Sequence, residues 1–209
     1  MTNTRFVDRQ RTGDMTDLLK HHIEKKTNQT LSKIDSNQFA KLVFEKSFNK
    51  KNLLVEEGGF CNYIYFIEQG SCYSYLTDEN GDKQVVQLAL EDYWISDLYS
   101  FFSGKKAIYT IETLEPTKVL VLNKEGFQKA CDTIPLLDRF FRILIQNAYV
   151  ALQQRMAKMN SEEAESRYAE FSKIHPDFIQ RIPQYLIASY LGVKPESLSR
   201  IRKGIAKKA

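Results

Sequence analysis

The sequence predicts an α+β protein: an antiparallel β-barrel, then a long helix, then a helix-turn-helix without a wing. Three observations carry this prediction. Short β-branched and aromatic segments separated by turn residues occupy 53–122, an apolar stripe with helical spacing follows Pro135, and a corner of small and apolar residues lies within 184–203. The chain accordingly divides into a flexible N-terminal extension (1–15), a barrel domain with flanking helices (16–134), a long helix (135–159) and a helix-turn-helix domain (160–209).

Composition indicates a folded protein with a sizeable core, because 43% of the 209 residues are hydrophobic and 12% are aromatic. Residues 1–14 are polar and precede a second methionine, Met15, so they are expected to lie outside the fold. The chain has no apolar leader and no run approaching the ~20 apolar residues of a membrane span. Its three cysteines lack CxxC spacing, and its three histidines do not pair with them in a metal-binding pattern. These features predict a reduced, cytoplasmic protein that needs no metal, cofactor or membrane.

The barrel prediction rests on six or more short strands at close spacing. The clearest of them are 63–67, 71–76, 84–90, 108–112 and 118–122. Asn80-Gly81 stands between two of these runs and is typical of a hairpin, because both residues tolerate positive φ. Such closely spaced strands favour an antiparallel barrel or sandwich over a parallel sheet, which would need a helix between each pair of strands.

The segment after Pro135 predicts one long helix. Its apolar residues recur every three or four positions, with a mean step of 3.6, at Phe141, Leu144, Ala148, Leu152, Met156 and Met159. A small barrel is too short to cover this whole stripe, so the stripe is expected to pair with its own copy in a two-fold dimer through Phe141, Leu144, Ala148, Leu152 and Met156. The alternative is that the stripe docks on its own barrel. Asn160 and Glu163 resemble a capping pair, which predicts a break near 159–161 and a new helix up to His175, before Pro176.

The segment 184–203 predicts two short helices joined by a tight corner. Ala188 supplies the small side chain where the helices cross, and Gly192 supplies the positive φ that ends the first helix. Pro195 suits the first turn of the second helix. The shared core is expected to contain Ile187, Leu191, Val193, Leu198 and Ile201. An ordinary helical hairpin is the alternative.

Charge is distributed unevenly along the chain. The balance of Lys and Arg over Asp and Glu is +5 for residues 1–52, −8 for 53–138 and +7 for 139–209. The basic groups after the corner are opposed only by Glu196; they are Lys194, Arg200, Arg202, Lys203, Lys207 and Lys208. We infer that the C-terminal domain meets a polyanion such as the phosphate backbone of double-stranded DNA, whereas the acidic middle has another role.

A barrel, a long helix and a helix-turn-helix in this order resemble the Crp/Fnr family of bacterial transcription regulators, over roughly residues 20–203. The motifs that carry the resemblance are 63–70 (YIYFIEQG), similar to the family's barrel strand and glycine turn, and 182–203, similar to its DNA reader. The block 92–104 lies where family members carry a short helix that cradles a cyclic-nucleotide phosphate. The resemblance implies a jelly-roll sensor like the cyclic-nucleotide-binding domain, a homodimer, a two-fold symmetric operator and RNA polymerase as a further partner.

The chain departs from the family where a nucleotide would bind. Family members that bind a cyclic nucleotide place a Glu in the short helix and an Arg after it, but this chain has Asp97 in the first place and Ala107 or Ile108 in the second. Lys105 or Lys106 could substitute, although a flexible point charge replaces a bidentate fork poorly. We therefore expect no tight binding of cyclic AMP and an unknown effector or none. A surviving pocket would be lined by Trp94, Asp97, Tyr99, Ala107, Ile108 and Tyr109; the alternative is that these aromatic residues are barrel core.

By analogy with the family's reader helix, Glu196 and Arg200 are the expected base contacts, because a carboxylate accepts from cytosine and a guanidinium engages guanine at two atoms. Ser197 and Ser199 would reach a base or a phosphate, and Lys194, Arg202 and Lys203 the backbone. No wing follows Lys203 before Ala209, so steep salt dependence is expected. The chain carries no recognisable catalytic motif, so we expect no enzyme activity. Two functions remain: a DNA-binding transcription regulator, or a ligand-sensing or protein-interaction module whose helix-turn-helix no longer binds DNA.

Overall fold

The computed structural model describes residues 9–10 and 15–208. The chain divides into two compact units, the first formed by residues 1–74 and 89–146 and the second by 75–88 and 147–209. Three elements pass from one unit to the other: the strands Cys72–Thr77 and Lys83–Ala89 and the helix Pro135–Ser161.

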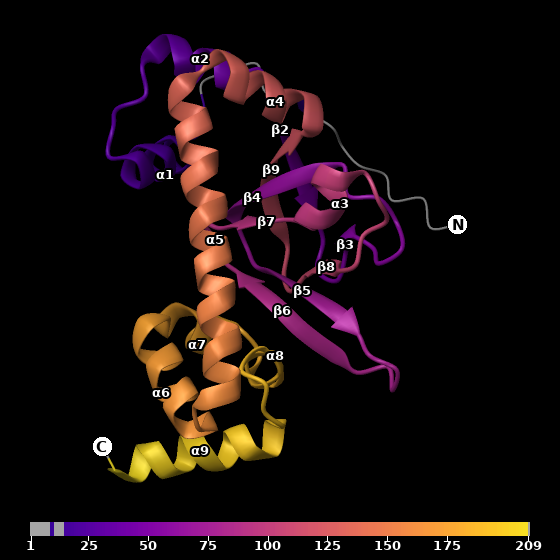
Figure 1. The fold of residues 1–209 in the computed structure, drawn as a ribbon, viewed down its shortest axis with the longest axis vertical. Helices are drawn as coiled ribbons and strands as arrows, with labels where there is room; N and C mark the ends of the chain where they lie inside the picture. Colours follow the sequence, from indigo (N-terminus) through magenta and orange to yellow (C-terminus); the bar gives the residue numbers. More distant parts are fainter. Residues whose placement is uncertain (1–8, 11–14, 209) are drawn as a thin grey trace. The chain divides into compact units, whose positions relative to one another are not determined.

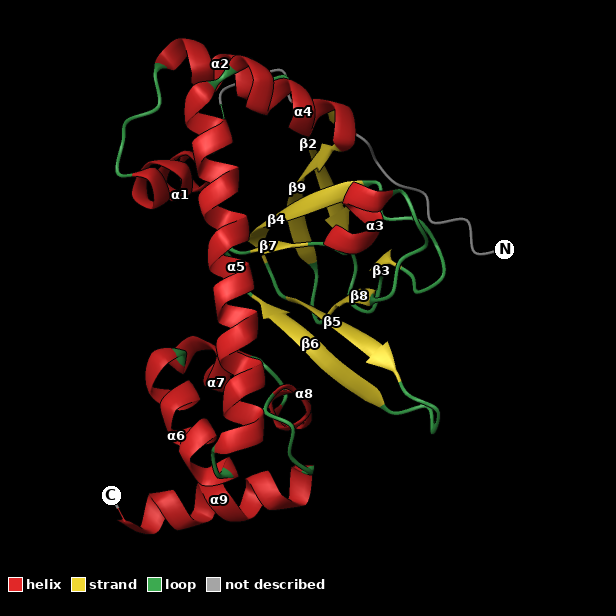
Figure 2. Cartoon of the chain, viewed as in Figure 1, coloured by secondary structure: helices red, strands yellow, loops and turns green. Residues whose placement is uncertain are grey.

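The strands form two sheets (Figure 2). The five-stranded sheet has the order β1-β2-β9-β4-β7, with β1 at Arg9–Gln10, β2 at Val43–Phe48, β9 at Thr117–Asn123, β4 at Tyr63–Gln69 and β7 at Trp94–Ile95. The four-stranded sheet has the order β3-β8-β5-β6, with β3 at Leu53–Val55, β8 at Thr110–Thr113, β5 at Cys72–Thr77 and β6 at Lys83–Ala89. The predicted closed barrel is therefore wrong and the sandwich alternative holds. A physical reason is that β7 and β3, each at a sheet edge, have only two and three residues, too few to join the sheets.

The core of the first unit lies around β4 and β9, which pair antiparallel from Tyr63 opposite Asn123 to Gln69 opposite Lys118. Residues 119–122 of β9 are all buried, so both faces of this strand are covered. The core also takes residues from the helices of this unit: α1 (Asp17–Thr27), α2 (Lys33–Ala40), α3 (Leu98–Ser103), α4 (Lys124–Thr133) and the first half of α5 (Pro135–Ser161).

The N-terminal extension was predicted to lie outside the fold. Arg9 and Gln10 instead form β1, which pairs with Glu45 and Phe44 of β2, and Met15 is buried in the core. The rest of the predicted extension before Met15 lies outside the described residues.

The second unit contains the second half of α5, the hairpin of β5 and β6, and four short helices (Figure 1). These helices are α6 (Ala164–Ile174), α7 (Pro176–Arg181), α8 (Gln184–Tyr190) and α9 (Pro195–Lys208). The predicted break after Met159 is found, because α5 ends at Ser161 and α6 begins at Ala164. The predicted cap is wrong: Asn160 is still inside α5, and the N-cap of α6 is Glu163, without a side-chain hydrogen bond.

Candidate functional site

In the first unit, the polar side chain of Asp97 is fully buried, with a relative exposure of 0%. One carboxylate oxygen accepts a hydrogen bond of 2.8 Å from the Ser100 amide and so caps α3. The other accepts from the amides of Ile108 and Tyr109, at 2.7 and 2.9 Å. Because each bond pairs a buried amide with an ionisable acceptor, the carboxylate holds α3 against the strand entry at 108–109.

Backbone hydrogen bonds of Ala107 fix the segment just before Ile108. Its amide donates to the Gly59 carbonyl and its carbonyl accepts from the Gly58 amide, both at 2.8 Å. Gly58 adopts a positive φ of 79° to make this turn. The segment that approaches the α3 N-terminus is therefore fixed on both sides by hydrogen bonds.

In the second unit, the turn between α8 and α9 has the geometry of a Schellman motif. The Val193 amide donates to the Ala188 carbonyl at 2.9 Å, and the Gly192 amide donates to the Ser189 carbonyl at 3.0 Å. Gly192 has φ +70°, and Ala188 is fully buried. The roles predicted for Ala188 and Gly192 at the corner are confirmed.

The second helix of this pair, α9, buries one stripe and exposes another. Leu198 is buried and Ile201 is half-buried. Every residue predicted to contact DNA is exposed: Lys194, Glu196, Ser197, Ser199, Arg200, Arg202 and Lys203. The helix therefore presents a polar, mainly basic face, while its apolar face packs within the unit.

The apolar stripe of α5 changes its environment along the helix. Phe141 is buried in the core of the first unit, and Leu144 is partly buried against it. These two residues are hence revised from dimer contacts to core contacts, as the docking alternative anticipated. Farther along, Ala148 is exposed, and Leu152 and Met156 are 43% and 57% exposed.

Two polar contacts in the second unit were missed from the sequence. The Ser189 hydroxyl on α8 accepts from the Val85 amide at 2.9 Å and donates to the Lys83 carbonyl at 2.8 Å, both on β6. From α5, Arg155 donates to the Val86 carbonyl at 2.6 Å. The Ser189 contacts join the hairpin to the first helix of the pair and the Arg155 contact joins it to α5. No local sequence pattern marks them.

Part of the chain matches a known family model. Residues 45–133 match the family model described as the cyclic nucleotide-binding domain. This segment is similar to that domain. None of the curated proteins matches the chain.

Solved structures resemble the chain over most of its length. FixK2 from Bradyrhizobium japonicum has a TM-score of 0.69 at 18% identity, with 79% of this chain and 85% of that chain covered. A variant of CooA from Carboxydothermus hydrogenoformans has a TM-score of 0.64 at 16% identity, covering 96% and 87%. The catabolite activator protein of Thermus thermophilus has a TM-score of 0.56 at 14% identity, covering 88% and 87%. The chain thus has a Crp/Fnr-like fold, as the sequence predicted.

The hydrogen bonds of Asp97 bear on whether a phosphate could bind at the α3 N-terminus. A phosphate bound at the α3 N-terminus would need free amides and a cation, but the Asp97 carboxylate already takes the amides of Ser100, Ile108 and Tyr109. The position after α3 holds buried Ala107, and Lys105 and Lys106 are exposed in the preceding loop. A phosphate there would meet a carboxylate instead of a guanidinium.

The structure joins three of the residues predicted to line an effector pocket. Asp97, Ile108 and Tyr109 are joined by hydrogen bonds, and Ala107 precedes them, but Tyr99 is exposed. Trp94 belongs to a different cluster: its ring centroid lies 5.3 Å from that of Phe66 and 5.6 Å from that of Phe141. For Trp94 the barrel-core alternative therefore describes the structure better.

Two further findings concern other kinds of site. Among residues 9–10 and 15–208, no group of three or more His, Cys, Asp or Glu side chains is arranged to hold a metal ion. Within the same residues, each helix is too short or too polar to cross a membrane.

Proposed function

We propose that the protein is a DNA-binding transcription regulator of the Crp/Fnr type, which binds a two-fold symmetric operator as a homodimer and is not controlled by cyclic AMP. The observation that carries the proposal is the α8–α9 pair. Its tight corner is closed by Gly192, and its second helix directs six polar residues to solvent, with exposed Lys194 just before it. An exposed helix with this face suits the major groove.

Within α9, the proposed division of roles follows side-chain chemistry. Arg200 would engage guanine through two donors, and Glu196 would accept from the cytosine amine. Lys194, Arg202 and Lys203 would neutralise phosphates, which predicts affinity that falls steeply with salt.

Dimerisation is supported by the second half of α5. Leu152 and Met156 expose 43% and 57% of their surface, on the stripe that also includes exposed Ala148. Exposed apolar residues at helical spacing are typical of a seam between helices, and a second copy of the same helix is the simplest partner. Leu152→Glu should shift sedimentation towards the monomer, whereas Gln153→Glu, next to it but off the stripe, should not.

Independence from cyclic AMP is supported by Asp97. Its buried carboxylate already accepts three amide hydrogen bonds next to α3, and Ala107 or Ile108 stands where the family's arginine is expected. Titration of the full chain with cyclic AMP should give no saturable heat.

The experiment that tests the function is selection of bound sequences from a random DNA pool, without ligand and at stated salt. An enriched palindrome supports the proposal. The Arg200→Ala variant should then discriminate less at one base position, where its binding free energy is weakened by ~1–3 kcal/mol. Equal loss across all sequences would remove Arg200 from base readout. Absence of any enriched sequence, together with capture of a protein partner unaffected by Arg200→Ala, would favour the interaction-module alternative.

A further inference from the structure

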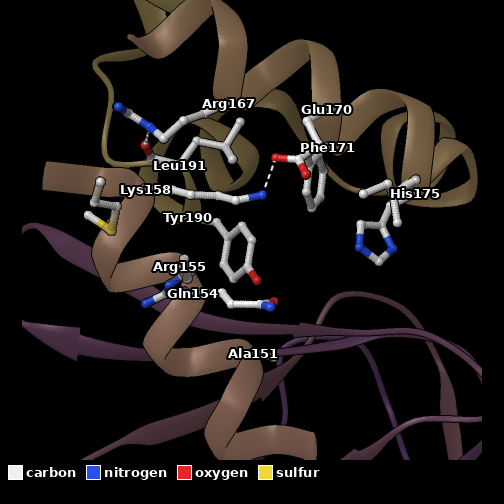
Figure 3. Close-up of a pocket in the computed structure, with 12 residues that line it drawn as sticks. Ala151, Gln154, Arg155, Lys158, Arg167, Glu170, Phe171, His175, Tyr190 and Leu191 are labelled. Carbon is white, nitrogen blue, oxygen red and sulfur yellow. Dashed lines mark hydrogen bonds and ion pairs between the residues drawn. The ribbon is translucent and has the colours of Figure 1, made fainter. Parts of the chain in front are cut away.

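The second unit contains a cavity that the function proposed above does not use. It has a volume of 220 Å³ and lies among α5, α6 and the end of α8. Figure 3 shows Tyr190 in its middle, with Arg155 and Gln154 of α5 on one side and Lys158 and Glu170 on the other. All of the lining residues belong to the second unit.

The cavity carries positive charge that its own residues leave uncompensated. Lys158 is paired with Glu170, but Arg155 and Arg167 have no carboxylate partner among the described residues. Arg155 donates to the Val86 carbonyl, and its Nε is buried without a hydrogen-bond partner. Arg167 donates to the carbonyls of Leu191, at 3.1 Å, and Glu162. The two guanidinium groups thus donate only to backbone carbonyls. The lining contains one carboxylate, Glu170, against the three cations Arg155, Lys158 and Arg167, an imbalance that a bound anion would offset.

Aromatic rings form the wall beside these charges. The ring centroid of Phe171 lies 5.6 Å from that of Tyr190 and 5.1 Å from that of His175. The Arg155 guanidinium lies over Tyr190, 4.6 Å from the ring centroid. Burial lowers the pKa of His175, so this ring is neutral at pH 7 and adds to the apolar surface. The volume falls below the ~300 Å³ at which drug-sized pockets begin, so the occupant is small.

We propose that this cavity binds a small planar organic carboxylate, with its ring against Tyr190 and Phe171 and its carboxylate on Arg155 or Arg167. An anion that recruits Arg155 competes with the Val86 carbonyl of the β5–β6 hairpin. The same hairpin contacts α8 through Ser189. Ligand binding therefore changes the contacts between the hairpin and the first helix of the helix-turn-helix. This regulatory consequence rests on the proposed DNA-binding function; the binding site itself does not.

The test is calorimetric titration of the full chain with benzoate, 4-hydroxybenzoate and indole-3-carboxylate. Benzamide serves as the uncharged match to benzoate. We predict saturable binding of at least one carboxylate and no binding of benzamide. Arg155→Gln or Arg167→Gln should lower the affinity for the carboxylate at least tenfold. Arg142→Gln, an exposed arginine of the same helix outside the cavity, should bind as the parent does.

Arg155→Lys keeps the charge and loses the planar fork, so it should retain the fold and weaken carboxylate binding. Equal binding of benzoate and benzamide, or binding unchanged in both glutamine variants, would overturn the proposal, as would no binding of any probe. These titrations contain no DNA. A protein that binds the carboxylate but no operator would refute the proposed function and leave the site standing.

Discussion

The Asp97 carboxylate accepts a hydrogen bond of 2.7 Å from the Ile108 amide. This buried side chain therefore holds the backbone just before β8 next to α3. Asp97→Ala would leave the amides of Ser100, Ile108 and Tyr109 without their acceptor inside the protein. We predict that it lowers the free energy of unfolding by at least about 3 kcal/mol, measured by urea denaturation.

Asp78 offers a matched control, because its carboxylate also accepts three hydrogen bonds, from Asn80, Asp82 and Gln84, but in an exposed hairpin turn. Asp78→Ala should cost much less, since water replaces the lost acceptor. Equal effects of the two variants would show that Asp97 does not hold the segment as argued.

Gly70 and Gly81 both have positive φ, of 97° and 84°, but different surroundings. A Cβ on Gly70 would lie 2.7 Å from the Pro116 carbonyl oxygen and 2.9 Å from the Thr117 Cα, whereas one on Gly81 would meet open space. Gly70→Ala should therefore cost about 1–3 kcal/mol more than Gly81→Ala, beyond the backbone strain that both variants share. Equal melting temperatures for the two variants would contradict the close approach at Gly70.

Burial lowers the pKa of His175 below its ordinary value of 6.5. The unfolded chain then takes up a proton more readily than the folded one, so this group favours folding above pH 6.5 and loses that contribution as the pH falls through the folded pKa. We predict that unfolding free energy declines between pH 7.5 and 5.5, and that His175→Gln shows a shallower decline. A parallel decline in both proteins would assign the effect to other groups.

Burial also raises the pKa of the thiols, to about 12 for Cys72 and about 11 for Cys131. At pH 8 few thiolates form, so both should react with a disulfide reagent far more slowly in the native state than in denaturant. Cys131, which is only half-buried, should react before the buried Cys61 and Cys72. Fast native labelling of Cys72 would contradict its burial.

The sequence predicted those features that local patterns encode. Ala188 and Gly192 form the helix corner because a small residue and a positive φ are needed there, whatever the distant surroundings. The strand at 63–67 was found because its residues are strongly apolar, and it forms most of β4. The long helix was likewise visible from its period.

Features that depend on distant residues were not visible. The hydrogen bond between Val85 and Ser189 joins positions 104 residues apart. From the sequence, Asp97 was expected to replace a Glu and to line a possible pocket. Its hydrogen bonds with the amides of residues 108 and 109 depend on the three-dimensional fold. The two-residue strand β7 is too short for a period, so its pairing with β4 could not be predicted.

We propose that this chain binds a symmetric DNA site without cyclic AMP. The most direct measurement is the affinity of the full chain for its selected operator at fixed salt, with and without saturating cyclic AMP. We predict the same affinity for the operator with and without cyclic AMP. We also predict that operator binding is lost when the salt concentration is doubled and in Leu152→Glu. Binding that appears only when cyclic AMP is added would contradict it.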